Sequence, residues 1–73
     1  MSLLDVIDGA SLVVVDPDQR LAYAWFGGAG VNVYDDDGRE VHYFTIGGVS
    51  RVTASSARAA IARMIEYSRS ETE

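Results

Sequence analysis

Three groups of turn-forming residues divide the first half of the chain into short segments, and they constrain its fold more than any other feature. Asp16-Pro17-Asp18-Gln19 places proline directly after aspartate, which is typical of a type I turn. Gly27-Gly28-Ala29-Gly30 and Asp36-Asp37-Gly38 contain the glycines that tight connections between strands require. Connections this short join antiparallel neighbours, because parallel strands need a crossover of about a dozen residues or more. The pattern therefore predicts an antiparallel β-meander.

The segments between these turns are rich in β-branched and aromatic residues, which favour strands. We expect strands over Ser11–Val15, Arg20–Phe26, Val31–Asp35 and Arg39–Ile46. Before them, Leu3–Asp8 predicts a short helical turn that Ser2 would cap and Gly9 would end, although an irregular apolar arm fits the same residues.

A helical pattern follows Gly47-Gly48. Thr53 is a candidate N-cap, Ala54–Arg69 is rich in helix-forming residues, and we expect Ser70–Glu73 to fray. At about 100° per residue, one side of this helix carries Ala57, Ala60, Ile61, Met64, Ile65, Tyr67 and Ser68. The opposite side carries Arg58, Ala59, Ala62, Arg63, Glu66 and Arg69. The chain is thus predicted to be one α+β domain over residues 1–73, a four-stranded antiparallel β-meander followed by one C-terminal amphipathic helix packed on one face.

Composition excludes several classes of protein. At 73 residues there is room for one domain with a thin core. The absence of cysteine excludes disulfides and thiolate metal sites. The net charge of -5, with arginine as the sole basic residue type, disfavours nucleic acid. No apolar run approaches the ~20 residues that span a bilayer, and Met1–Asp5 lacks the basic start of a signal peptide, so we expect a soluble cytoplasmic protein.

Hairpin registers predict which side chains share a face of the sheet. A three-residue loop over Asp36–Gly38 places Asp35 opposite Arg39, and it separates apolar from polar positions, which a two-residue turn would mix. At the glycine-rich connection, a loop of two or four residues places Phe26 opposite Val31. The core face, packed against the helix, would then hold Ala22, Ala24, Phe26, Val31, Val33, Val41 and Tyr43. The other face would hold Tyr23, Trp25, Asn32, Tyr34, Glu40, His42 and Phe44.

This second face is the predicted binding site, since only the segment over Leu3–Ile7 is available to cover it. The predicted binding residues are Tyr23, Trp25, Asn32, Tyr34, His42 and Phe44. Contiguous exposed aromatic area usually marks a contact surface, although core filling would account for about half of these aromatic residues. We therefore expect a non-enzymatic module that binds a protein partner or a second copy of itself, forming a homodimer.

The motifs that suggest other chemistry have simpler interpretations. Asp35–Glu40 superficially matches a calcium loop, but the chain doubles back there, as in a solvated hairpin turn. The glycine-rich connection lacks the lysine and following helix of a phosphate-binding loop. His42 beside Glu40 and Asn32 could perform acid–base catalysis, which leaves an enzyme as a further alternative, but a polar strand position is the commoner role. We predict no cofactor, metal or catalytic residue.

Two resemblances accompany this interpretation. The order of four strands and one helix resembles, in topology, the dimeric single-strand-binding fold of eukaryotic transcriptional coactivators, and aromatic residues on a sheet are similar to those on which RNA-recognition domains stack bases. They imply the alternative function of a dimeric single-stranded nucleic-acid-binding protein. The short, acidic chain without lysine or cysteine also resembles the accessory proteins of bacteriophages that infect GC-rich bacterial hosts. That resemblance implies binding to a host or defence component.

Overall fold

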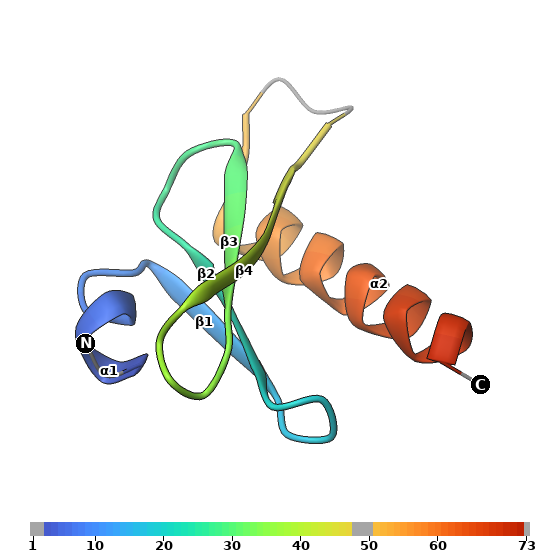
Figure 1. Ribbon diagram of the computed structural model, residues 1–73. Coiled ribbons are helices and arrows are strands. Elements are labelled where there is room, and N and C mark those ends of the chain that lie inside the picture. Colours follow the sequence, from blue (N-terminus) through green and yellow to red (C-terminus); the bar gives the residue numbers. More distant parts are fainter. Residues whose placement is uncertain (1–2, 48–50, 73) are drawn as a thin grey trace.

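A computed structural model describes residues 3–47 and 51–72 of the chain (Figure 1). Its elements are α1 (Leu3–Ile7), β1 (Leu12–Asp16), β2 (Leu21–Trp25), β3 (Gly30–Tyr34), β4 (Glu40–Thr45) and α2 (Ala54–Thr72). The strands form one antiparallel sheet in the order β1-β2-β3-β4. The predicted α+β fold, a meander followed by a helix, is confirmed.

Local chemistry explains where the elements begin and end. Between β3 and β4, the Asp35 carboxylate accepts hydrogen bonds from the backbone N–H groups of Asp37 (3.0 Å) and Arg39 (2.9 Å). Gly38 adopts a positive φ of 84° in the same turn, as the three-residue loop requires. At the start of α2, Thr53 and Ser56 each accept a hydrogen bond from the other's backbone N–H through the side-chain oxygen. These observations confirm the turn and the N-cap.

The two helices also agree closely with expectation. α1 ends before Gly9, which has a positive φ of 88°, while the predicted cap at Ser2 lies outside the described residues. The backbone of α2 remains helical through Thr72, three residues beyond the predicted end at Arg69. The prediction that the chain frays from Ser70 was therefore wrong for residues 70–72.

The register between β2 and β3 differs by one residue from the prediction. Trp25, and not Phe26, lies opposite Val31, so that the connection has odd parity. The indole N–H of Trp25 donates to the backbone carbonyl of Gly28 at 2.6 Å. A buried indole needs such a hydrogen-bond acceptor, and Gly27, with a φ of 100°, allows the loop to bend toward it. Glycine residues permit connections with an odd or an even number of residues, and the hydrogen bond of the Trp25 indole favours the odd one.

A β-bulge changes the register between β3 and β4. Tyr34 lies opposite Glu40, as predicted, but Val33 lies opposite His42, which leaves Val41 as the extra residue. From the bulge onward each side chain of β4 points to the face opposite to the predicted one. The bulge compensates for the one-residue shift between β2 and β3, so that apolar residues of β2, β3 and β4 share one face: Trp25, Val31 and Phe44.

These two shifts move the side chains of β2, and those of β4 after the bulge, to the face opposite to the predicted one, whereas Val31 and Val33 of β3 lie beneath α2 as predicted. The face that packs against α2 contains Tyr23, Trp25, Val31, Val33 and Phe44. Tyr23 and Trp25 are only 4% and 7% exposed. Ala22 and Ala24, predicted to lie beneath the helix, are buried on the other face, between larger side chains of β1 and β3 that lie opposite them. The prediction that these alanines receive the helix was wrong.

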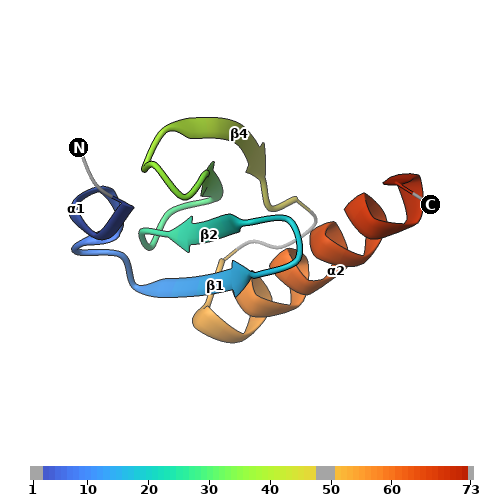
Figure 2. The same ribbon diagram turned by 60° about the horizontal axis from the view of Figure 1, so that its bottom comes forward.

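The core lies between the sheet and the first turns of α2. Ala57 and Ile61 of the helix are fully buried against the aromatic and valine side chains of the sheet. Among the strands, α2 packs mainly against β1. Figure 2 shows that α2 begins beside the sheet and extends past the strands toward its C-terminal end. In Figure 1 the sheet stands between α1 and α2. The later turns of α2 therefore leave β4 only partly covered.

Candidate binding groove between β4 and α2

The structure divides the six predicted binding residues between the two faces of the sheet. Tyr23, Trp25, His42 and Phe44 lie on the face beneath α2, whereas Asn32 and Tyr34 lie on the opposite face. Since Tyr23 and Trp25 belong to the core, they are not available to contact a partner. The predicted six-residue surface is therefore not formed, because the two register shifts place its residues on different faces of the sheet.

The residues considered for acid–base chemistry are also separated. His42 lies opposite Val33 beneath α2, while Glu40 lies opposite Tyr34 on the other face, because Val41 is bulged between them. The side-chain amide of Asn32 donates a hydrogen bond to the Glu40 carboxylate. The cluster of His42 with Glu40 and Asn32 does not form, so these residues do not make a common acid–base site.

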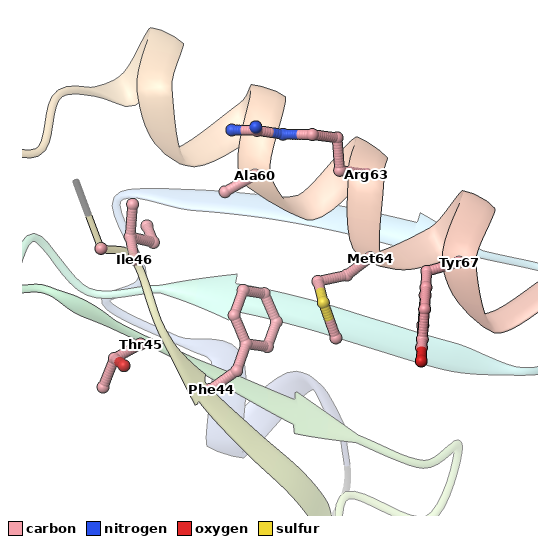
Figure 3. A pocket seen from close by; sticks show the side chains of 8 residues that line it. Phe44, Thr45, Ile46, Ala60, Arg63, Met64 and Tyr67 are labelled. Carbon is pink, nitrogen blue, oxygen red and sulfur yellow. The ribbon is translucent and has the colours of Figure 1, made fainter. Parts of the chain in front are cut away.

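In its place, the divergence of α2 from the sheet opens a groove with a volume of about 380 Å³ (Figure 3). We call it the β4–α2 groove. It is lined by Phe44, Thr45, Ile46 and Gly47 from β4 and the segment after it, and by Ala60, Arg63, Met64 and Tyr67 from α2. Tyr67 is 61% exposed, although the helical pattern placed it on the core-facing side. The groove thus presents an apolar floor and an exposed aromatic ring.

Phe44 joins the floor of the groove to the core. Its ring packs edge-to-face against Tyr23, with the centroids 6.5 Å apart and the planes at 62°. Figure 3 shows the Phe44 ring beneath α2, directed toward the side chain of Met64. The Phe44 ring therefore contacts the core through Tyr23 and also lines the groove.

A second hollow, of about 270 Å³, adjoins the groove through Met64 and Tyr67. His42 lines this hollow together with Leu21, Tyr23, Val33 and Ser68. His42 itself is exposed. Of the predicted binding residues, His42 and Phe44 therefore border concave surfaces, in two hollows that share Met64 and Tyr67.

The backbone of β4 forms an edge of the sheet beside this groove. Within the described residues, β4 pairs only with β3. The N–H of Ile46 donates to the carbonyl of Ala29 at 2.7 Å, so Ile46 points its backbone groups toward β3. Because backbone groups alternate in direction along a strand, those of Thr45 and Tyr43 face outward. The edge therefore offers hydrogen-bond donors and acceptors next to the apolar groove.

Charge is distributed unequally along β4. The beginning of the strand and the turn before it carry four acidic residues, Asp35, Asp36, Asp37 and Glu40, and one basic residue, Arg39. Arg63 lies beside the end of the strand, where it lines the groove with Thr45 and Ile46. Arg51 lies near Ile46, in a further hollow of about 580 Å³ beside the glycine-rich loop. β4 thus runs from an acidic end to a basic end.

A buried carboxylate, that of Asp16, anchors the C-terminal end of α2. Asp16 is 1% exposed and accepts hydrogen bonds from the side chains of Gln19 (3.0 Å) and Arg69 (3.1 Å). Arg69 also pairs with Asp18 at 3.0 Å, and the Ser68 hydroxyl donates to the Gln19 side-chain oxygen at 2.9 Å. The turn after β1 is therefore tied to the last turns of α2, which helps to fix the angle at which the helix leaves the sheet.

The same contacts control ionisation around Asp16. Burial alone would raise its pKa, but the hydrogen bond and positive charge of Arg69, with the hydrogen bonds from Gln19, hold the pKa below its ordinary value. Burial and the nearby Asp16 charge raise the pKa of the Tyr23 phenol. Asp16 was predicted only as a turn residue. The signal that was missed is an acidic residue at the end of an apolar strand, together with an arginine in the last turns of the long C-terminal helix.

The acidic turn shows a structural role. The carboxylates of Asp35, Asp36 and Asp37 lie within 4.8 Å of one another, close enough to hold a cation together. The Asp35 carboxylate is already used to stabilise the turn through backbone N–H groups, and Asp36 pairs with Arg20 at 3.8 Å. These contacts account for the acidic residues as parts of a solvated hairpin.

No protein-family model, curated protein or solved structure matches this chain. Within the described residues, no helix is both long enough and apolar enough to cross a membrane.

Proposed function

We propose that this chain is a non-enzymatic protein-binding module that receives its partner in the β4–α2 groove. The observation that carries the proposal is the position of an exposed aromatic ring, Tyr67, above an apolar floor and beside an open strand edge. Interfaces are enriched in tyrosine, phenylalanine and methionine, all of which line this groove. Strand edges bind extended protein segments through backbone hydrogen bonds, while adjoining pockets receive their side chains.

The groove is better suited to a protein than to a nucleic acid. Two of the aromatic residues predicted to be available for base stacking, Tyr23 and Trp25, are in the core. The acidic residues at one end of β4 and the net charge of -5 would repel a phosphate backbone. An extended protein segment, in contrast, can place apolar side chains in the groove and hydrogen-bond to the edge of β4.

The resemblance to phage accessory proteins adds a class of partner to the proposal. A host or defence component with an exposed strand or extended segment would fit the same groove. Such a partner would be blocked, since its own segment would be held against β4.

Photochemical cross-linking tests the proposal directly. A photoreactive phenylalanine analogue in place of Tyr67 should form an adduct with a protein when the chain is irradiated, either purified at high concentration or in an extract of the cells that produce it. The same analogue in place of Phe26, an aromatic residue 43% exposed and outside the groove, is the matched control. The absence of any protein adduct at position 67, or equal adducts at both positions, would refute the proposal.

A further inference from the structure

We infer that the occupant of the β4–α2 groove is a second copy of this chain, bound through antiparallel pairing of the two β4 strands about a two-fold axis near Tyr43 and Phe44. The inference rests on the proposed function and names the partner at that same site. It joins two four-stranded sheets into one of eight strands, with both α2 helices on the same side.

The edge of β4 has little protection against pairing. Natural edge strands are commonly protected by lysine, proline, inward-facing charges or bulges. The bulge in β4 is at Val41, near its beginning, while the four residues from His42 to Thr45 include no aspartate, glutamate, lysine, arginine or proline. Tyr43 and Thr45 are exposed and point their backbone groups outward. This half of the strand can therefore extend the sheet.

Charge favours an antiparallel copy over a parallel one. The acidic residues lie at the beginning of β4, and Arg63 and Arg51 lie beside its end. An antiparallel neighbour places its own acidic end beside these arginines, and the two-fold axis repeats the match at the other end. A parallel copy would place acidic residues beside acidic residues. A strand with an acidic end and a basic end is therefore complementary to an antiparallel copy of itself.

The chain exposes more surface than a compact monomer of its mass, and a strand edge alone is too small for a stable interface. Its accessible surface is 4858 Å², compared with roughly 4,400 Å² expected for a compact monomer of this mass. A stable interface buries about 800 Å² on each partner. Because a bare strand edge offers less than this, the dimer must also cover the apolar groove beside Phe44 and Met64 and its exposed rim at Tyr67.

Sedimentation equilibrium tests the inference with two edge substitutions that match in chemistry. Thr45 and Val15 are both β-branched and exposed, and both lie on the face away from α2, but on opposite edges of the sheet. We expect the native chain and Val15→Lys to have twice the mass of one chain at high micromolar concentration. Thr45→Lys should have the mass of one chain, with an unchanged circular dichroism spectrum. Arg63→Glu should raise the dissociation constant about tenfold, because the two-fold axis repeats the altered contact.

The outcomes separate this inference from the proposed function. A native chain that stays monomeric, or a Thr45→Lys variant that remains a dimer, would overturn the dimer. If the native chain is monomeric while the photoreactive residue at position 67 captures a different protein, the inference fails and the proposed function stands. If neither a dimer nor an adduct forms, both fail.

Discussion

At the scale of single residues, Asp16 shows how a polar side chain can stabilise a thin core. Its carboxylate is buried but fully used, because Arg69, Gln19 and the backbone N–H of Asp18 all donate to it. Within the described residues, no buried side-chain nitrogen or oxygen lacks a hydrogen-bond partner. Replacing one member of such a network leaves the others without a partner, which costs more than the net value of the bonds.

The first prediction concerns this carboxylate. Asp16→Asn should lower the free energy of unfolding by about 2 kcal/mol at neutral pH, because the charged contact with Arg69 is lost. Since the pKa of Asp16 is lowered on folding, its contribution is present above the unfolded value of 3.8 and disappears as the pH falls through the folded value. Urea titrations from neutral pH to pH ~3 should therefore show the native chain and the variant converging in acid. Asp37→Asn, at an exposed position, is the control, and a constant difference at all pH values would contradict this role for Asp16.

The second prediction separates core from surface aromatic residues. Trp25→Ala should cost about 3–5 kcal/mol, enough to unfold much of a domain this small, because it removes a buried ring. Tyr67→Ala should change stability by less than about 0.5 kcal/mol, because its ring is 61% exposed. Circular dichroism and thermal melting of both variants would check this. A folded Trp25→Ala protein of native stability would show instead that the tryptophan lies at the surface.

At the scale of elements, local chemistry made the strands, turns and helices predictable but left the registers undecided. The Asp35–Arg39 turn and the Thr53 cap could be predicted because their side chains hydrogen-bond within a few residues of themselves. The parity of the glycine-rich loop could not, since glycine fits several turn geometries and the deciding bond comes from Trp25. The bulge at Val41 could not be predicted either, because it compensates for the register shift between β2 and β3.

These register shifts explain why the candidate site was only partly predicted. A shift of one residue exchanges the faces of a strand, so one wrong connection moved Tyr23 and Trp25 from the surface to the core. His42 and Phe44 still line concave surfaces, but beneath α2 and not on an uncovered face. Met64 and Tyr67 were interpreted as core residues, because helical periodicity shows which side faces the sheet but not where the helix leaves it.

The third prediction tests the start of α2. Thr53→Ala should lower the free energy of unfolding by about 1 kcal/mol, because it removes one half of the reciprocal bonds with Ser56. Chemical denaturation followed by circular dichroism would measure the loss. Ser55→Ala, a substitution in the same exposed first turn outside this pair, should have less than half the effect. Equal losses in the two variants would argue against a specific cap.

At the scale of the whole molecule, one helix cannot cover a four-stranded sheet completely. α2 packs mainly against β1 and is tied to the turn after it through Arg69, so its later turns diverge from β4. The resulting groove and the open edge of β4 are the parts of the molecule that a partner can complete. The thin core of a 73-residue chain and its binding surface therefore have the same origin, the placement of one helix near one side of the sheet.

Hydrogen exchange at different protein concentrations is a direct test of pairing through β4, because it locates an interface on individual elements. If two copies pair through β4, exchange of the outward-facing amides of Tyr43 and Thr45 should slow at least about tenfold between low and high micromolar concentration. The amides of β1, on the opposite edge, should exchange at the same rate throughout. Protection that does not change in β4, or that rises at β1 instead, would contradict the assignment of this edge and groove as the interface.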